Sequence, residues 1–311
     1  EVKCVSDTRP PFYEITEVKP LNNATPHALF IDLGVSASDV WVVNDGYWGI
    51  AVTEGQRYNF QFYLFTEELK NTVVTAALLD REEQIVVSKN FQIERDGSWN
   101  HYEGTFTVDT TANDLRFALL LPHKGKVYID FVSMFPENTF CGHKNGLRED
   151  VAGMLRDLRP DFVRWPGGCI VEGLTMDNRI KWKETIGDIV KRPGEYNLWG
   201  YRSTYGFGYH EFLQFCEDID ADGMFVCNAG MSCLFRNGDY WEEENRIDNL
   251  IQDALDAIEY ALGDTTTVYG KRRAENGHAA PFPLKYVEVG NENVGLRYVK
   301  NYNRFYKAIK E

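Results

Sequence analysis

The chain has 311 residues, of which 43% are hydrophobic and 14% aromatic, so it is not a disordered segment and is long enough for two domains. Its 47 acidic and 33 basic residues give a net charge of −14 without a basic block, which makes nucleic acid an unexpected partner. No apolar run approaches the ~20 residues that a membrane-spanning helix needs.

The first part of the chain alternates apolar and polar residues with a period of two. Turn signals such as Asn-Asp-Gly at 44–46 and Asp-Gly-Ser at 96–98 separate the alternating runs. These runs lie at 58–65, 73–79, 115–121 and 127–132. Short alternating runs with frequent turns are typical of an antiparallel β-sandwich. We therefore predict a β-sandwich of the jelly-roll type over residues 1–136.

Beyond Pro136, amphipathic helices alternate with short apolar strands. The three units are helix 147–158 with strand 161–165, helix 209–219 with strand 224–228, and helix 241–262 with strand 286–290. This order indicates a parallel α/β domain over residues 137–311, with a further helix from about Arg297. A closed (β/α)₈ barrel needs about 250 residues, so this domain is either a small open sheet or a truncated barrel.

The six cysteines show no CxxC pair and are expected to be buried thiols rather than a disulfide framework. They are Cys4, Cys141, Cys169, Cys216, Cys227 and Cys233. The histidines show no metal-ligand spacing, and Cys141 with His143 lacks a second ligand pair. The sequence therefore predicts no metal ligands.

The third of these strands ends in Gly-Asn-Glu-Asn at 290–293, which places a carboxylate and two amides where the backbone turns. In parallel α/β proteins, chemistry occurs at this end of a strand. Glu292 can act there as a general acid, and Asn291 can hold a substrate hydroxyl. The same residue types also form ordinary turns, so this motif alone does not decide between the two interpretations.

Other segments carry a family resemblance. They are 162–173 (Phe-Val-Arg-Trp-Pro-Gly-Gly-Cys-Ile-Val-Glu-Gly), 197–204 (Asn-Leu-Trp-Gly-Tyr-Arg-Ser-Thr), 289–292 (Val-Gly-Asn-Glu), and 44–52 and 129–136 in the first domain. Together they resemble the α-L-arabinofuranosidases of glycoside hydrolase family 51, in the branch with an inserted carbohydrate-binding-like sandwich. The resemblance implies such a sandwich at 1–136 and about strands 2 to 4 of a TIM barrel at 137–311, in a chain that is an internal fragment.

The resemblance also implies a retaining mechanism with two carboxylates. Glu292 would protonate the leaving oxygen and later activate water, and Asn291 would bind the sugar 2-hydroxyl. The family takes its nucleophile from a later strand, so we expect the fragment to be inactive. Glu288 is expected to pair with Arg164, and Glu172 to form a structural salt bridge, rather than to replace the nucleophile.

Four further residues are candidates for substrate binding by the same resemblance. Gly168 would let the backbone approach the ligand closely, and Cys169 matches a family cysteine that touches the furanose. Asn228 and Trp199 would line the cleft, although packing explains them equally well. The implied substrates are arabinan, arabinoxylan or related plant oligosaccharides, with no organic cofactor and a secreted or periplasmic location. The sequence does not indicate an oligomeric state.

The sandwich offers two further candidates. Its aromatic residues form either a sugar-stacking platform or ordinary core: Trp41, Tyr47, Trp48, Trp99 and Tyr102. Asp130 resembles an acidic position that binds structural calcium in related sandwiches, but it is one ligand where calcium needs six to eight.

Two other functions remain open. In the first alternative, the chain is a carbohydrate-binding module with a non-catalytic α/β partner. In the second, it is another retaining glycosidase, such as an endo-glucanase or xylanase. The first predicts polysaccharide binding that depends on Trp48 or Trp99 and not on Glu292. The second predicts an open, extended cleft.

Overall fold

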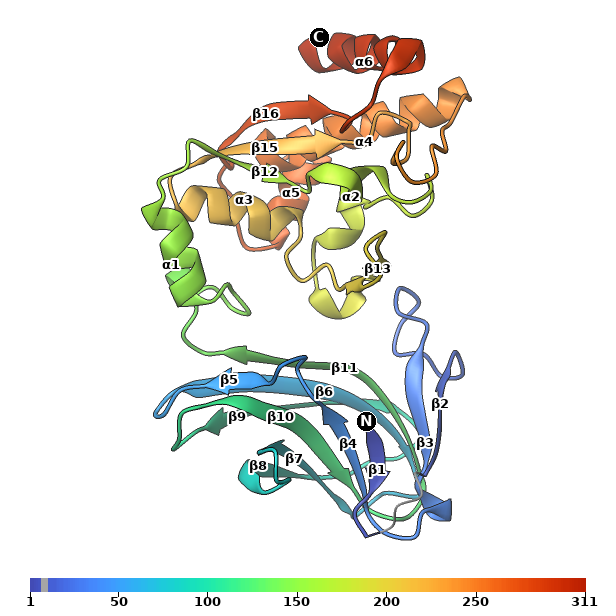
Figure 1. Ribbon diagram of the computed structural model, residues 1–311, viewed down its shortest axis with the longest axis vertical. Helices are drawn as coiled ribbons and strands as arrows, with labels where there is room; N and C mark the ends of the chain where they lie inside the picture. The colour runs from blue at the N-terminus through green and yellow to red at the C-terminus, as the bar shows by residue number, and fades with distance from the viewer. Residues whose placement is uncertain (7–10) are drawn as a thin grey trace. The chain divides into compact units, whose positions relative to one another are not determined.

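The computed structural model describes residues 1–6 and 11–311, which form two compact units, Glu1–Ala152 and Gly153–Glu311 (Figure 1). The last sandwich strand ends at Pro136, and the residue that follows still contacts the first unit. The Glu137 N–H donates to the Arg57 carbonyl at 2.8 Å, and the two side chains form an ion pair at 3.1 Å. The first compact unit therefore includes residues beyond the boundary predicted at 136.

Antiparallel sheets in two layers form the first unit, which confirms the predicted β-sandwich. One sheet, among the described residues, has the order β1 (Val2–Cys4), β4 (Val40–Asn44), β10 (Ala112–Leu121), β7 (Val73–Leu79) and β8 (Ile85–Gln92), with β5 (Ile50–Val52) beside β10. The other has the order β2 (Phe12–Thr16), β3 (Ala28–Asp32), β11 (Lys126–Pro136), β6 (Arg57–Glu67) and β9 (Trp99–Thr107). Short 3₁₀ turns follow β3 (Leu33–Val35) and β11 (Phe140–Gly142).

Alternation along β6 shows how the sequence pattern makes this sandwich. Phe60, Phe62 and Leu64 are at most 3% exposed and pack between the sheets. The intervening Asn59 and Gln61 lie on the outer face, opposite residues of β9. Burial of each phenylalanine contributes roughly 1.5–3 kcal/mol, so a one-residue shift in register would expose the whole inner row.

The second unit is built on a parallel sheet with the order β12 (Phe162–Trp165), β15 (Asp222–Cys227) and β16 (Leu284–Val289). Its helices are α1 (Glu149–Asp157), which enters from the first unit, α2 (Gly168–Glu172), α3 (Tyr209–Asp218), α4 (Glu244–Leu262), α5 (Val268–Glu275) and α6 (Gly295–Lys310). Its minor elements are 3₁₀ turns at Trp182–Thr185 and Ile189–Lys191 and the hairpin β13 (Glu195–Tyr196) and β14 (Arg202–Ser203). Consecutive parallel strands are neighbours, as in part of a (β/α)₈ barrel, and the sheet does not close among the described residues.

The two faces of this parallel sheet differ. On one face, Trp165 stacks on Phe212 of α3 at 5.9 Å and on Phe225 at 6.3 Å, inside a buried core. The other face carries Arg164 and Glu288, whose side chains are each 33% exposed. An open face of this kind is expected for a few strands of a barrel.

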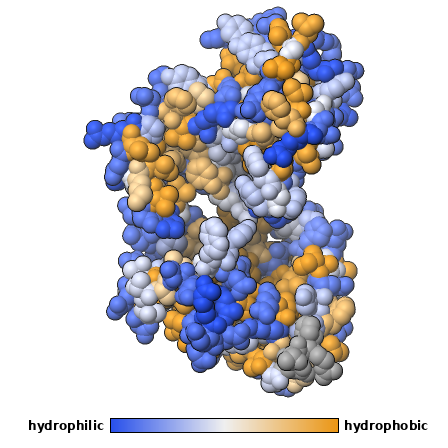
Figure 2. Space-filling model, viewed as in Figure 1, coloured by the Kyte–Doolittle hydropathy of each residue, from blue (hydrophilic) through white to orange (hydrophobic). Residues whose placement is uncertain are grey.

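Apolar side chains are also exposed on α6. Leu296 is 89% exposed and Tyr306 is 53% exposed. Figure 2 shows hydrophobic side chains among hydrophilic ones on this unit, at the end where Figure 1 places α6. No helix among the described residues is long and apolar enough to cross a membrane.

Candidate active site

The candidate site lies at the carboxyl ends of the three parallel strands, where the segments after β12, β15 and β16 meet. The turn after β16 requires glycine at its first position, because Gly290 has φ +76° and a Cβ there would lie 2.3 Å from Asn293 Oδ1. Glu292 itself has φ 50°, an uncommon conformation for a residue with a side chain. This turn leaves Glu292 exposed and Asn291 buried.

A chain of hydrogen bonds runs from the open face of the sheet into this turn. Arg164 donates from Nε and Nη2 to the two carboxylate oxygens of Glu288, each at 2.6 Å, which confirms the predicted pair. Arg164 Nη2 also donates to Asn291 Oδ1 at 3.0 Å. Asn291 Nδ2 in turn donates to Glu172 Oε2 at 3.1 Å, and Asn293 Nδ2 donates to Glu172 Oε1 at 2.9 Å.

Glu172 does not form the salt bridge that the sequence predicts. Its side chain is 1% exposed, and its hydrogen-bond partners in the described chain are the amides of Asn291 and Asn293 and the thiol of Cys169, with no ion pair to a Lys or Arg. Burial raises the pKa of Glu172, the bond from Asn291 opposes this shift, and the nearby charge of Glu292 raises the pKa further. Glu172 is therefore a buried acceptor that fixes two amides.

The thiol of Cys169 lies beside the exposed carboxylate. Cys169 Sγ is 3.9 Å from Glu292 Oε2, at sulfur hydrogen-bonding distance. Burial, followed by a hydrogen bond with Cys233, raises the pKa of Cys169 to about 12. The thiol therefore stays protonated at neutral pH and acts as a weak donor rather than as a nucleophile.

The remaining predicted residues differ in their surroundings. Gly168 begins α2 with φ +53° and open space where a side chain would lie. Asn228 is 7% exposed; its Nδ2 donates to the carbonyls of Val171 at 2.9 Å and Met231 at 3.1 Å, and its Oδ1 accepts from Gly230 N at 2.7 Å. The amide of Asn228 thus holds the loop after β15 against α2.

Trp199 lies in the loop of the β13–β14 hairpin. Its side chain is 48% exposed, and its ring centroid is 6.5 Å from that of Tyr201. Asn178 Nδ2 donates to Glu195 Oε1 at 2.7 Å and to the Tyr196 carbonyl at 2.8 Å, which ties the hairpin to the segment after α2. The structure thus joins Glu292, Cys169 and Asn291 by short contacts and places Trp199 on a neighbouring hairpin.

Two residues at the site are absent from the sequence-based candidates. Asn293 is the second amide on Glu172. Cys233 lies in the loop after β15 and contacts Cys169. The position of Cys233 shortly after a strand end was the sequence signal that could have identified it as a site residue. The expectation that all cysteines are buried is wrong for Cys141, which is exposed because it lies in a surface turn with φ 55°.

The sandwich aromatics do not form one flat platform. Trp41 is 8% exposed in the core, whereas Tyr47 and Trp48 are 91% and 92% exposed at a turn. Trp99 Nε1 donates to the carbonyls of Lys19 and Pro20, and Tyr102 stacks on Phe62 with a centroid distance of 5.3 Å. These side chains therefore play separate parts in the sandwich.

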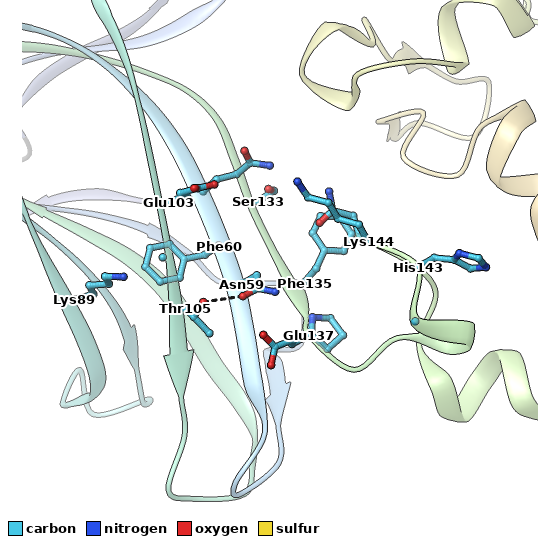
Figure 3. Close-up of a pocket in the computed structure, with 15 residues that line it drawn as sticks. Asn59, Phe60, Lys89, Glu103, Thr105, Ser133, Phe135, Glu137, His143 and Lys144 are labelled. Carbon is cyan, nitrogen blue, oxygen red and sulfur yellow. Dashed lines mark hydrogen bonds between the residues drawn. The ribbon is translucent and has the colours of Figure 1, made fainter. Parts of the chain in front are cut away.

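A polar groove of about 550 Å³ is lined by residues of β6, β9 and β11, by Lys89 of β8 and by the turn at 142–145 (Figure 3). Asn59 Oδ1 accepts a hydrogen bond from Thr105 Oγ1 at 2.8 Å in the groove. Its polar and charged lining residues are Asn59, Gln61, Lys89, Glu103, Thr105, Ser133, Glu137, His143, Lys144 and Asn145. Such a surface suits a ligand with many hydroxyl groups.

Asp130 offers little for calcium. Its Oδ1 accepts from Phe131 N at 2.7 Å, and its Oδ2 is buried without a hydrogen-bond partner. Burial raises the pKa of Asp130, which favours the neutral carboxyl group. Calcium needs six to eight oxygen ligands, of which the carboxylate of Asp130 would supply one or two.

Comparison with known proteins identifies a family for each of the two parts of the chain. The Alpha-L-arabinofuranosidase 1 domain family matches residues 154–311, and a Carbohydrate binding domain family matches residues 34–125. Alpha-L-arabinofuranosidase 1 of Arabidopsis thaliana is 37% identical over 281 residues, which cover 89% of this chain and 40% of that protein. The extracellular exo-alpha-L-arabinofuranosidase of Streptomyces chartreusis is 35% identical over 294 residues, which cover 90% of this chain and 34% of that protein.

A solved structure extends the match to the fold of both units. The arabinose-bound MgGH51 α-L-arabinofuranosidase is 28% identical with a TM-score of 0.89, covering 99% of this chain and 50% of that one. The chain thus spans about 40% of the Arabidopsis relative's length. This chain belongs to the α-L-arabinofuranosidase family, glycoside hydrolase family 51, and combines a carbohydrate-binding-type sandwich with part of the family's barrel domain.

Proposed function

We propose that this chain supplies the acid/base half of the active site of a retaining α-L-arabinofuranosidase, which releases terminal arabinofuranosyl residues from arabinan or arabinoxylan. The observation that carries the proposal is the position of Glu292, exposed at the carboxyl end of β16, with Cys169 Sγ 3.9 Å from its carboxylate. The names of the relatives, one of them extracellular, support this substrate class and a secreted enzyme.

In the proposed reaction, Glu292 transfers one proton in each step. As the glycosidic bond breaks, the protonated Glu292 gives its proton to the leaving oxygen while a separate carboxylate attacks the anomeric carbon. The ionised Glu292 then takes a proton from the water that releases the sugar. Asn291 would hold the 2-hydroxyl, because Arg164 and Glu172 fix the orientation of its amide and leave one N–H for the ligand.

The nucleophile is proposed to lie outside these 311 residues. A retaining enzyme needs a second carboxylate about 5–5.5 Å from the first. Glu288 is engaged by Arg164, and Glu172 is buried under two amides, so neither is free to attack a sugar. The longer relatives, of which this chain spans 40% or less in the Arabidopsis and Streptomyces cases, have room for the missing group.

The test compares the 311-residue chain with a longer protein that contains it, using an aryl α-L-arabinofuranoside. We expect no turnover by the chain alone. In the longer protein, Glu292→Gln should lower kcat by about 10²–10⁴-fold, the range for loss of a general acid or base. Azide, which needs no general base, should restore turnover of an activated aryl substrate by Glu292→Ala.

Each outcome bears on a separate part of the proposal. Turnover by the 311-residue chain that disappears in Glu292→Gln would refute the proposal that the nucleophile lies outside this chain. An unchanged kcat for Glu292→Gln in the longer protein would refute the acid/base role. An extended product pattern from internal cleavage of xylan or glucan would instead support an endo-acting glycosidase.

A second candidate function is saccharide binding by the sandwich. The polar groove and the match of residues 34–125 to a carbohydrate binding domain favour it. Calorimetry with arabinoxylan oligosaccharides should show binding that Gln61→Ala weakens, with Glu292→Gln as the control for binding in the α/β unit. Saccharide binding that is unchanged in Gln61→Ala but lost in Trp48→Ala would place the ligand at the exposed turn instead.

A further inference from the structure

We propose that Cys169, Glu172 and Cys233 form a binding site for a thiophilic divalent cation such as Zn²⁺ or Cd²⁺. The two sulfurs and a carboxylate oxygen of Glu172 all lie within 4.8 Å of one another. No other group of three potential His, Cys, Asp or Glu ligands is this close within residues 1–6 and 11–311. Glu172 and Cys233 are each 1% exposed, and Cys169 is half-buried.

The backbone holds the three side chains together without a metal. Cys169 and Glu172 are three residues apart on α2, so they share one face of the helix. The Cys233 N–H donates to the Gly173 carbonyl at 3.0 Å, which ties the loop after β15 to the end of α2. The Cys233 carbonyl accepts from Gly238 N at 3.1 Å, so this loop is itself a closed turn.

The ligand set selects the kind of cation. Two thiolates and one carboxylate suit Zn²⁺ or Cd²⁺, whereas Ca²⁺ and Mg²⁺ require mainly oxygen ligands. With Zn–S of about 2.3 Å and Zn–O of about 2.0–2.2 Å, tetrahedral ligands are separated by roughly 3.5–3.8 Å. The observed upper separation of 4.8 Å therefore requires a contraction of about 1 Å. Binding would release two protons, one from each thiol.

The site would place a cation beside the proposed acid/base. Glu292 Oε2 is 3.9 Å from Cys169 Sγ, close enough to become the fourth ligand after a small shift. A cation held in this way would engage both Cys169 and Glu292 and prevent Glu292 from exchanging a proton with a substrate. The metal site itself depends only on the side-chain geometry, so it can be tested without substrate.

The test titrates Cd²⁺ alone into the 311-residue chain and follows thiolate-to-cadmium charge-transfer absorbance, with calorimetry for stoichiometry. We expect one tight Cd²⁺ per chain. Cys169→Ser and Cys233→Ser should each weaken binding by at least about 100-fold, because loss of a direct ligand exceeds the 10–100-fold typical of the groups behind it. Cys141→Ser, which removes the exposed thiol, is the matched control and should leave the affinity unchanged.

Cys169→Ser decides the outcome, because Cys169 is only half-buried and its serine variant is expected to fold, as circular dichroism can verify. Unchanged Cd²⁺ affinity in folded Cys169→Ser would overturn the proposal. Loss of the signal in Cys141→Ser alone would also overturn it. Failure of the glycosidase proposal would leave these binding results unaffected.

Discussion

Glu172 Oε2 accepts a hydrogen bond from Asn291 Nδ2 at 3.1 Å, which connects the helix after β12 to the turn after β16. The other oxygen of Glu172 accepts from Asn293, so one buried carboxylate fixes the residues on both sides of Glu292. Glu172 therefore positions the turn that carries Glu292, and its ionisation has consequences for stability.

We expect the stabilising effect of Glu172 to decline as the pH rises. Burial raises its pKa in the folded chain above the usual 4.5, so the folded state retains a proton that the unfolded chain releases. The contribution of Glu172 to the free energy of unfolding is fully present below pH 4.5 and is lost as the pH rises through the pKa of the folded chain. The free energy of unfolding, measured with urea relative to Glu172→Gln, should fall as the pH rises above about 4.5.

The exposed Glu275→Gln on α5 controls for removal of a surface charge and should show no such trend. A wild-type free energy of unfolding that rises with pH relative to that of Glu172→Gln would contradict the raised pKa. It would mean that the two amide bonds outweigh the cost of burial.

Replacement of Arg164 by lysine should break the hydrogen-bond chain at its start. Lysine cannot reproduce the paired bonds to Glu288 together with the bond to Asn291. Because the pair is one-third exposed, we expect a loss of only about 1 kcal/mol in the free energy of unfolding.

In a double-mutant cycle with Glu288→Gln, the coupling energy should be about 0.5–1 kcal/mol and should shrink with added salt. Additive effects of the two substitutions would show that the pair contributes nothing.

Much of this fold could be predicted because its pattern is local. The period-two runs identify the main sandwich strands, and the repeated helix-then-strand pattern identifies the parallel sheet. Two helices were missed for physical reasons. α2 has five residues with a glycine at its start, and α5 (Val-Tyr-Gly-Lys-Arg-Arg-Ala-Glu) is mainly polar and has no clear apolar face.

The candidate site was predictable only in part. Parallel strands end at one edge of a sheet, so a sequence that places Glu292 and Cys169 after two such strands also brings them close in space. The contact of Asn293 with Glu172 depends on the turn geometry at Gly290. The approach of Cys233 to Cys169 depends on how the loop after β15 folds against α2, which no local spacing in the sequence indicates.

The two sandwich tryptophans, Trp48 and Trp99, should respond in opposite ways to removal. The indole N–H of Trp99 donates to the carbonyls of Lys19 and Pro20, and its ring packs against Phe65 with a centroid distance of 6.1 Å. Trp99→Ala should therefore cost about 1–3 kcal/mol in thermal unfolding. Trp48 is 92% exposed, so Trp48→Ala should stay within about 0.5 kcal/mol of the wild type. A large loss of stability for Trp48→Ala would show that its side chain packs in solution.

Gly290→Ala and Gly277→Ala separate backbone strain from crowding at the turn that carries Glu292. Both glycines have positive φ, +76° and +100°, but only Gly290 is enclosed. A Cβ at Gly277 meets nothing within 4 Å, so Gly277→Ala should cost only the strain of about 1–2 kcal/mol. A Cβ at Gly290 would lie 2.3 Å from Asn293 Oδ1 and 3.1 Å from Ala229 Cβ.

Gly290→Ala should therefore cost about 2–4 kcal/mol in urea unfolding, because crowding adds to the strain. The displaced Asn293 would also release Glu172, so the pH dependence expected for Glu172 should change in Gly290→Ala and not in Gly277→Ala. Equal losses of stability in the two variants would show that the turn moves aside at little cost. In that case the conformation of Glu292 would not be fixed by the packing of Asn293 against Gly290.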